Sequence, residues 1–379
     1  MNRRLAVVFG GDFETDPAGR VLMPDKLVDG LVAYTQRWSG PVTLVAGSAP
    51  HDESGNLGSY FRDPQDLPFE LALSGDRAES LRRLRPAMTL LPVNIAHRYA
   101  AAVPSYVAVA ENPPHEEYRL IVALGMPLAQ RPRAFLGGIR RLGSYARVVR
   151  GAVGVQCNGY PAMRLFGRHS PRPLLYFDTR LTRTAVAREA GRPRPPLAAP
   201  LRLGFSGRLA GEKGPQFAVE AHRRLARAGA PTTLTIFGSG PMEEQLRREA
   251  ADGVIFAGSV PFESEWIERI PREVDLMVLP HPQGDPSGTY LEAAGLGVPF
   301  VAFANVAAQS LTSRHGLGWS TRMNDVGGLV RRIQRLNEDP SQVRAAADRG
   351  RAFMTEHCFE HEFDRRVEHL EACAAISAR

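Results

Sequence analysis

The second half of the chain alternates short apolar runs with segments in which apolar side chains recur every three or four positions. The short runs are typical of buried strands, and the segments between them have helical spacing. This alternation predicts parallel strands joined by crossover helices, as in a Rossmann-like domain. The predicted strands are Leu201–Phe205, Thr233–Phe237, Val254–Ala257, Val274–Leu279 and Phe300–Phe303.

The first half contains a similar but less regular series of apolar runs. Its predicted strands are Leu5–Phe9, Val42–Ala46, Met88–Leu91, Tyr106–Ala110 and Ala152–Gln156. The proline-rich segment Gly191–Pro200 has little apolar content and is typical of a linker. We therefore expect an α/β protein with two Rossmann-like, doubly wound parallel-sheet domains, residues 1–195 and 196–355, that face a cleft. Three helices are predicted at Asp325–Leu336, Ser341–Glu356 and Glu360–Ala375, and we expect the end of the chain, residues 356–379, to pack back toward the first domain.

Length and composition agree with a two-domain protein of the cytoplasm. A chain of 379 residues is too long for one ordinary core. The three cysteines are scattered and show no CxxC spacing, which indicates a reducing compartment. The apolar start of the chain is too short for a signal peptide. The longest apolar tract, Pro86 to Ala110, is interrupted by prolines and polar residues, so we expect no membrane-spanning helix.

The net charge of +7 is modest, but positive charge is concentrated in one region. Ten arginines and no acidic residue lie between Tyr118 and Phe177. At the centre of this region, Arg131–Arg150 has the pattern of a helix with an apolar and a cationic side. Such a helix can pack on its own domain with solvated arginines, or it can contact anionic lipid headgroups at the membrane surface. Nucleic acid is not an expected partner, because neither interleaved aromatic residues nor a known binding motif is present.

Lys213 is one of only two lysines among 47 basic residues, and it follows a strand that ends in small residues. Gly207 and Arg208 directly follow this strand, and Lys213 leads into a predicted helix. Arginine grips phosphate oxygens with its planar fork, whereas lysine supplies a compact point charge. The two cations at a helix N-terminus indicate a clamp for a diphosphate. The alternative is that Lys213 lies on a solvated helix start.

Small-residue turns follow the next two predicted strands. Gly238 and Gly240 come after the second strand, and Gly258 and Val260 come after the third. Glycine allows a backbone to approach a ligand closely, and a flat base can lie against such a turn. A tight strand-to-helix turn or a packing role explains the same residues.

The fourth strand leads into a segment, Pro280 to Pro299, that begins a helix. Its first residues, Ser287, Gly288 and Thr289, offer backbone N–H groups that can cap phosphate oxygens. Glu292 follows about one turn later among apolar neighbours, where a carboxylate can accept hydrogen bonds from the two hydroxyls of a ribose. A solvated helical glutamate is the alternative interpretation.

Taken together, these residues resemble the nucleotide-sugar glycosyltransferases of the GT-B fold, specifically the retaining family 4 type. The resemblance covers residues 201–301 and depends on motifs that stand in the family's order and spacing. These motifs are Gly207-Arg208, Glu212-Lys213-Gly214, Gly238-Ser239-Gly240-Pro241, Gly258-Ser259-Val260, Glu292-Ala293 and Gly297-Val298-Pro299. The resemblance implies that Arg208 and Lys213 bind the donor diphosphate and that Glu292 holds the ribose.

One position departs from the family pattern. The family has a further glutamate eight positions before the residue that corresponds to Glu292, and this chain has Gly284 there. In the family that carboxylate touches hydroxyls of the donor sugar. The neighbouring Asp285 is the substitute that the sequence offers, which leaves the identity of the donor sugar open.

The first domain resembles the family only in outline. Gly10 and Gly11 after the first predicted strand resemble the family's glycine loop, which lies under the donor phosphates and the acceptor. Relatives often have a polar residue that faces the sugar after the strand equivalent to Tyr106–Ala110. Glu111 and His115 are the candidates here, and the alternative is that either caps a loop.

The expected reaction is the transfer of a hexose from a nucleoside diphosphate sugar to an acceptor hydroxyl, with retention and without a metal ion or other cofactor. Positive charge at Arg208 and Lys213 would stabilise the leaving diphosphate. The acceptor would be a glycan, a lipid-linked molecule or a small molecule. The alternatives are a nucleotide-sugar epimerase or hydrolase of the same fold, or a non-catalytic protein that binds sugar nucleotides.

Overall fold

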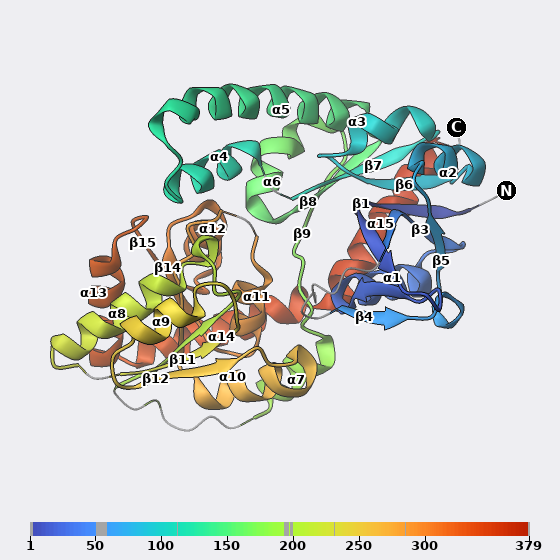
Figure 1. Cartoon of the computed structure of the whole chain (residues 1–379). Helices are drawn as coiled ribbons and strands as arrows, with labels where there is room; N and C mark the ends of the chain where they lie inside the picture. Colours follow the sequence, from blue (N-terminus) through green and yellow to red (C-terminus); the bar gives the residue numbers. More distant parts are fainter. Residues whose placement is uncertain are drawn as a thin grey trace. The chain divides into compact units, whose positions relative to one another are not determined.

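The computed structural model describes residues 3–50, 59–111, 113–192, 197, 200–230, 232–284 and 286–377. The chain divides into two compact units (Figure 1). Unit 1 contains Met1–Pro113, Gly137–Tyr176 and Glu360–Arg379, and unit 2 contains Pro114–Leu136 and Phe177–Phe359. The predicted boundary between residues 195 and 196 falls inside unit 2. Most of the predicted linker, residues 193–196 and 198–199, lies outside the described residues.

Unit 1 is built on a mostly parallel sheet with the strand order β4-β2-β1-β6-β7-β8-β9, in which β3 pairs with β1 and β5 pairs with β3. Only β2 is antiparallel to its neighbours β1 and β4. The strands are β1 Leu5–Thr15, β2 Val21–Pro24, β3 Val42–Pro50, β4 Ser59–Arg62, β5 Glu70–Leu73, β6 Met88–Pro92, β7 Tyr106–Ala110, β8 Gly154–Asn158 and β9 Pro173–Tyr176. The helices are α1 Asp25–Arg37, η1 Pro64–Asp66, α2 Arg77–Leu84, α3 Ala96–Tyr99, η2 Ala100–Ala102, α5 Arg131–Gly151, which begins in unit 2, α6 Gly159–Phe166, η4 Gly167–His169 and α15 Phe359–Ser377.

The C-terminal helix α15 packs against the sheet of unit 1. Gln156 on β8 donates from Nε2 to the carbonyl oxygen of Arg366 over 2.9 Å, and Arg366 Nε donates back to Gln156 Oε1 over 2.9 Å. Arg37 on α1 forms an ion pair with Asp364 at 2.6 Å. These reciprocal bonds satisfy the buried Gln156 amide and join the end of the chain to residues more than 200 positions earlier.

Unit 2 contains a parallel sheet with the strand order β12-β11-β10-β13-β14-β15. The strands are β10 Arg202–Ser206, β11 Thr233–Phe237, β12 Val254–Gly258, β13 Leu276–Leu279, β14 Phe300–Phe303 and β15 Gly318–Thr321. The helices are α4 Pro114–Ala123, η3 Leu128–Gln130, α7 Arg183–Ala190, η5 Gly211–Lys213, α8 Pro215–Arg227, α9 Glu243–Glu249, η6 Phe262–Trp266, α10 Ile267–Glu273, α11 Gly288–Gly295, α12 Val306–His315, α13 Val326–Glu338 and α14 Ser341–Glu356. Helices α8 and α13 lie side by side and bury their apolar faces on the strands (Figure 1).

The predicted strands of the second half all occur in this sheet, and their ends differ by at most two residues from the prediction. The order β11-β10-β13 places the point where the strand order reverses beside β10, the position where open parallel sheets bind ligands. The prediction that strand β1 ends at Phe9 is wrong, because β1 continues to Thr15 through an irregularity between Val8 and Asp12. Gly11 therefore lies within an irregular strand and not in a loop after it.

No helix in the described part of the chain is long and apolar enough to cross a membrane.

Candidate functional site

The candidate site lies where the strands β10 to β13 end in unit 2. Backbone hydrogen bonds join the loops that follow these strands. The Gly207 amide donates to the Phe237 carbonyl oxygen over 3.0 Å, and the Gly238 amide donates to the Gly258 carbonyl oxygen over 2.7 Å. The predicted site residues Gly207 and Gly238 follow adjacent strands and Gly258 ends the next strand, so the three lie together on one edge of the sheet.

Three glycines make the contact between these loops possible. A Cβ atom on Gly238 would overlap the carbonyl oxygen of Gly207, and a Cβ on Gly214 would overlap that of Pro280. A Cβ on Gly240 would lie 2.7 Å from the Leu209 carbonyl oxygen. The structure thus gives these glycines a packing role between loops. Their contact with a ligand stays a prediction.

The turn at the end of β12 is less crowded than the turns after β10 and β11. Gly258 has a φ of +73°, and a Cβ placed on it would meet open space. Val260 is half-buried, and between these two residues the exposed Ser259 hydroxyl lies 2.8 Å from that of Ser239. This surface is open enough to accept a flat group, as the sequence predicts for a base.

The two predicted phosphate ligands lie at either end of the short loop after β10. Arg208 is exposed and forms an ion pair with Glu212, whereas Lys213 is half-buried with its stem 3.8 Å from a Cβ placed on Gly207. Burial raises the pKa of the Glu212 carboxyl, but the hydrogen bonds from Arg208 and from the backbone, together with the charges of Arg208 and Lys213, outweigh this effect, so the pKa lies below its ordinary value. Glu212 is therefore ionised at neutral pH. Arg208 is available to a ligand at little cost, since exposed ion pairs contribute little to stability.

His281 lies directly after β13 and was not predicted from the sequence. Its side chain is buried, its ring centroid lies 5.1 Å from that of Tyr290, and neither ring nitrogen has a hydrogen-bond partner within the described part of the chain. Burial, with the positive charge of Lys213, lowers the pKa of His281 well below its ordinary value. The ring is thus neutral at pH 7 and does not compete with Lys213 for an anion.

Helix α11 supplies the remaining predicted residues of unit 2. Ser287 is its N-cap and makes no side-chain capping bond, and Gly288 and Thr289 form its half-buried first turn. The first N–H groups of a helix lack intrahelical acceptors, so they are the donors that an anion can use. The backbone holds the segment before α11 close to the Lys213 loop, because the backbone N–H of Gln283 donates a hydrogen bond to the Glu212 carbonyl oxygen over 3.3 Å. Asp285 lies outside the described residues, so its proposed role stays a prediction.

Glu292 is buried, with 3% of its surface exposed. Its Oε1 accepts hydrogen bonds from the backbone N and from Nε of Arg180, both over 3.3 Å. Arg180 also stacks on Phe262, with its Cζ atom 3.7 Å from the ring centroid. No hydrogen bond reaches the second oxygen, Oε2, from the described residues. Sequence analysis missed Arg180, because nothing in the sequence links it to a residue 112 positions later.

The three other candidates are distributed over both units. Gly11 and the exposed Glu111 belong to unit 1, where the Gly11 carbonyl oxygen accepts a hydrogen bond from Arg77 over 2.7 Å. His115 lies at the start of α4 in unit 2, and its Nε2 is 3.2 Å from Glu116 Oε1. Among the described residues, no group of three or more His, Cys, Asp or Glu side chains has an arrangement that could hold a metal ion.

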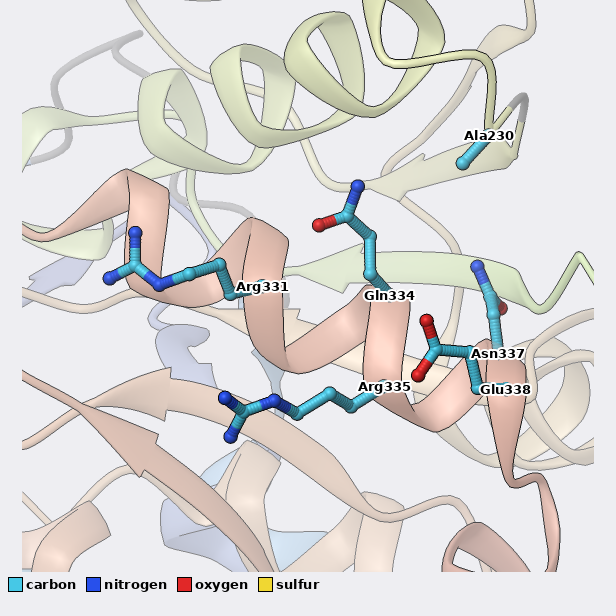
Figure 2. Close-up of a pocket in the computed structure, with 6 residues that line it drawn as sticks. All are labelled: Ala230, Arg331, Gln334, Arg335, Asn337 and Glu338. Atoms are coloured by element: carbon cyan, nitrogen blue, oxygen red, sulfur yellow. The ribbon is translucent and has the colours of Figure 1, made fainter.

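A separate depression of about 510 Å³ lies along α13 (Figure 2). Its lining residues are Ala230, Arg331, Gln334, Arg335, Asn337 and Glu338. Asn337 accepts a hydrogen bond from the Leu201 amide over 3.0 Å, and Ala230 precedes β11, so the depression lies at the amino ends of the strands. It contains none of the predicted site residues, and parallel sheets bind ligands at the opposite ends.

Comparison with known proteins relates unit 2 to sugar-transferring enzymes. Residues 200–339 match the family model "Glycosyl transferases group 1". The 2-deoxystreptamine glucosyltransferase of Streptomyces kanamyceticus is 27% identical over 164 residues, which is 42% of each chain. The colanic acid biosynthesis glycosyltransferase WcaL of Escherichia coli K12, whose assignment is putative, is 27% identical over 205 residues, or 51% of this chain and 49% of that one. The matches thus span half or less of these relatives.

The fold extends over the whole chain. The structure of Anabaena HepE in complex with UDP and glucose matches with a TM-score of 0.65 and 14% identity, and covers 98% of this chain and 100% of that one. This similarity confirms the expected α/β architecture.

The contact between loops predicts unequal effects of two glycine substitutions. In Gly238→Ala the new methyl group overlaps the Gly207 carbonyl oxygen. In Gly258→Ala the methyl group meets open space, and the only cost is that alanine must adopt a left-handed backbone conformation. We expect Gly258→Ala to lower the free energy of unfolding by about 1 to 2 kcal/mol. Gly238→Ala should cost about 1 to 3 kcal/mol more, because the loops must separate. Chemical denaturation of both variants measures the difference, and equal losses would contradict the contact between the loops.

Proposed function

Because residues 200–339 match the group 1 glycosyl transferases and the chain has the GT-B fold, we propose that this protein is a hexosyltransferase. It transfers a sugar from a nucleoside diphosphate donor to an acceptor hydroxyl. The observation that carries the proposal is the close approach of the Lys213 loop to the segment that begins α11, through the Gln283 to Glu212 bond and the Gly214 to Pro280 contact. Two cations and the start of a helix are thereby available to one diphosphate.

The chemistry of this arrangement follows from charge. When the bond between sugar and phosphate breaks, negative charge grows on the leaving diphosphate. Lys213 and Arg208, with the N–H groups of Gly288 and Thr289, stabilise this charge in the transition state more than in the ground state. In the proposed reaction these groups neutralise the charge of the leaving diphosphate, which a bound metal ion does in other transferases. Retention at the anomeric carbon is proposed from the family resemblance.

Glu292 is proposed to bind the ribose of the donor. Arg180 holds one carboxylate oxygen, which fixes the orientation of the side chain, and the second oxygen is left to accept a hydroxyl proton. A charged acceptor in a buried position forms strong hydrogen bonds. The turn at Gly258 and Val260, with the exposed Ser259 between them, would then receive the base.

The donor and acceptor classes are proposed from the relatives. The HepE structure contains UDP and glucose, which supports a uridine diphosphate hexose as the first donor to test. The names of the two sequence relatives refer to 2-deoxystreptamine and to colanic acid biosynthesis, which supports a small-molecule or glycan acceptor. An epimerase or hydrolase of the same fold would consume the donor alone. Donor consumption measured with and without acceptor therefore separates these activities.

The first functional prediction concerns the cation pair. Lys213→Ala and Arg208→Ala should each lower kcat for transfer by about 100-fold or more, because each removes charge from the leaving group. Lys26→Ala, at the other lysine of the chain, is the control and should keep wild-type turnover. Wild-type rates in both site variants would exclude the diphosphate clamp.

The second functional prediction concerns the ribose. Glu292→Gln should weaken binding of the nucleoside diphosphate about tenfold or more, since a hydrogen bond to a charged group is lost. Glu220→Gln is the control, because Glu220 on α8 is also held by arginines. Titration calorimetry measures both affinities. If the Glu292 variant binds the nucleoside diphosphate as tightly as the wild type, Glu292 does not bind the ribose.

Contact with an anionic membrane is proposed for the first half of α5. Phe135, Leu136 and Ile139 are 51%, 55% and 51% exposed, and the exposed Arg133 and Arg140 lie on the same helix. An exposed apolar stripe with flanking arginines suits the surface of an anionic bilayer. It is the second of the interpretations that the sequence left open for this helix.

This proposal predicts co-sedimentation with vesicles that contain phosphatidylglycerol and not with vesicles of phosphatidylcholine alone. Ile139→Ser should reduce the bound fraction, because the buried apolar area supplies part of the binding energy. Ile255→Ser on β12, where the side chain is 54% exposed, is a matched control and should bind normally. Equal binding of all three proteins would contradict the role of α5.

A further inference from the structure

Glu116 lies against the position where the sequence departs from the family pattern. A Cβ placed on the buried Gly284 would overlap Glu116 Oε2, and it would lie 3.0 Å from Cδ and 3.2 Å from Cγ of the same side chain. Glu116 belongs to α4, which is more than 160 positions earlier in the sequence. The space into which a side chain at position 284 would extend is therefore filled by a carboxylate from another element.

The Glu116 carboxylate is buried and charged. Only 7% of the residue is exposed. Oε1 accepts a hydrogen bond from Arg119 over 2.8 Å and lies 3.2 Å from Nε2 of His115. Burial raises the pKa of Glu116, but the hydrogen bond from His115 and the charge of Arg119 outweigh it, so the pKa lies below its ordinary value.

The second carboxylate oxygen of Glu116, Oε2, is not bound by these two neighbours. Both partners bind Oε1, and no hydrogen bond reaches Oε2 from the described residues. A carboxylate oxygen that no neighbour binds is available to a hydroxyl or amide donor from a ligand, and a hydrogen bond to a charged acceptor is strong. Glu116 repeats the arrangement of Glu292, in which one oxygen is fixed and the other is left open.

The surroundings of Glu116 connect it with the diphosphate clamp. The Leu124 side chain, just after α4, lies 3.0 Å from a Cβ placed on Gly211, the first residue of the turn that ends at Lys213. The Gln283 amide next to Gly284 bonds to the carbonyl oxygen of Glu212 in the same turn. Glu116 thus packs against the segment before α11, which is hydrogen-bonded to the Lys213 loop. In a nucleoside diphosphate sugar, the sugar is bonded directly to the outer phosphate. With the diphosphate at this clamp, the hydroxyls of the sugar would lie near a carboxylate on this segment.

We propose that Glu116 is a sugar-binding residue whose Oε2 accepts hydrogen bonds from hydroxyls of the donor sugar. This inference rests on the proposed function, since it requires a sugar nucleotide in the site. It assigns to α4 the contact that the sequence alone assigns to Asp285. It also explains Gly284, because a larger residue there would displace the Glu116 side chain, and a glutamate there would add charge repulsion.

The test compares Glu116→Gln with Asp285→Asn and with Glu117→Gln, a control on the same helix. For each variant, melting temperature, affinity for the nucleoside diphosphate, affinity for the nucleoside diphosphate sugar and transfer rate are measured, with UDP and UDP-glucose as the probes. We expect Glu116→Gln to keep the affinity for UDP but to lose the additional affinity that the sugar provides. Its kcat/KM for the donor should fall about tenfold or more. Glu117→Gln should behave as the wild type.

A second experiment separates a sugar contact from a merely structural role. Gly284→Glu alone should impair transfer, because two carboxylates then compete for one space. Combining it with Glu116→Ala should restore part of the activity, since the carboxylate is supplied from position 284 instead. Rescue supports the proposal, whereas a double variant no more active than either single variant overturns it.

The outcomes also distinguish this inference from the proposed function. If Asp285→Asn removes the sugar-dependent affinity and Glu116→Gln does not, the sugar ligand is Asp285 and the proposal for Glu116 is wrong, while the transferase assignment stands. If the wild-type protein binds no sugar nucleotide and transfers no sugar, the proposed function itself fails.

Discussion

The candidate site depends on backbone-to-backbone contact between the loops at the carboxyl edge of the unit 2 sheet. Gly238 lies against the Gly207 carbonyl oxygen and Gly214 lies against that of Pro280, so neither position has room for a Cβ atom. A side chain at either point would push the loops apart. In the proposed site, Lys213 would then lie further from the start of α11. The glycines therefore act on the proposed chemistry indirectly, because they set the distance between the groups that carry charge.

The charges of the site follow a common arrangement. Each of the two buried carboxylates, Glu116 and Glu292, is bound through Oε1 by cationic neighbours, and no described residue binds its Oε2. A basic partner orients each carboxylate, while the other oxygen is left for a ligand in the proposed site. The cations differ from the carboxylates in burial. Arg208 is exposed and pairs with Glu212 at the surface, so it can turn to a diphosphate in the proposed site, and Lys213 lies beside the neutral His281, which adds no competing charge.

The sequence predicted the sheet of unit 2 well because its central strands, β10, β11, β13 and β14, are mostly buried on both faces and read as continuous apolar runs. It missed β15, where Trp319, Ser320 and Thr321 form no such run. It also placed the end of β1 too early, because Gly10 and Gly11 were interpreted as a loop. The motif residues of unit 2 follow strands directly, so their place at one edge of the sheet could be predicted, whereas their roles stay predictions. Arg180 and Glu116 were not found, because their neighbours in space are far away in sequence and only the tertiary structure brings them together.

The position of α4 shows why a linear motif can misjudge a site. Judged by sequence alone, Gly284 marks the loss of a carboxylate, which suggests a weakened or inactive enzyme. In the structure, however, the absence of a side chain at Gly284 makes room for the ionised Glu116 from α4. The position of a charge in a site is set by space and not by the order of residues, so in the proposed site Glu116 would supply the carboxylate that the family has at the position of Gly284. A glycine at this position in a related chain is therefore evidence of lost function only if no acidic residue from α4 occupies the space that it leaves.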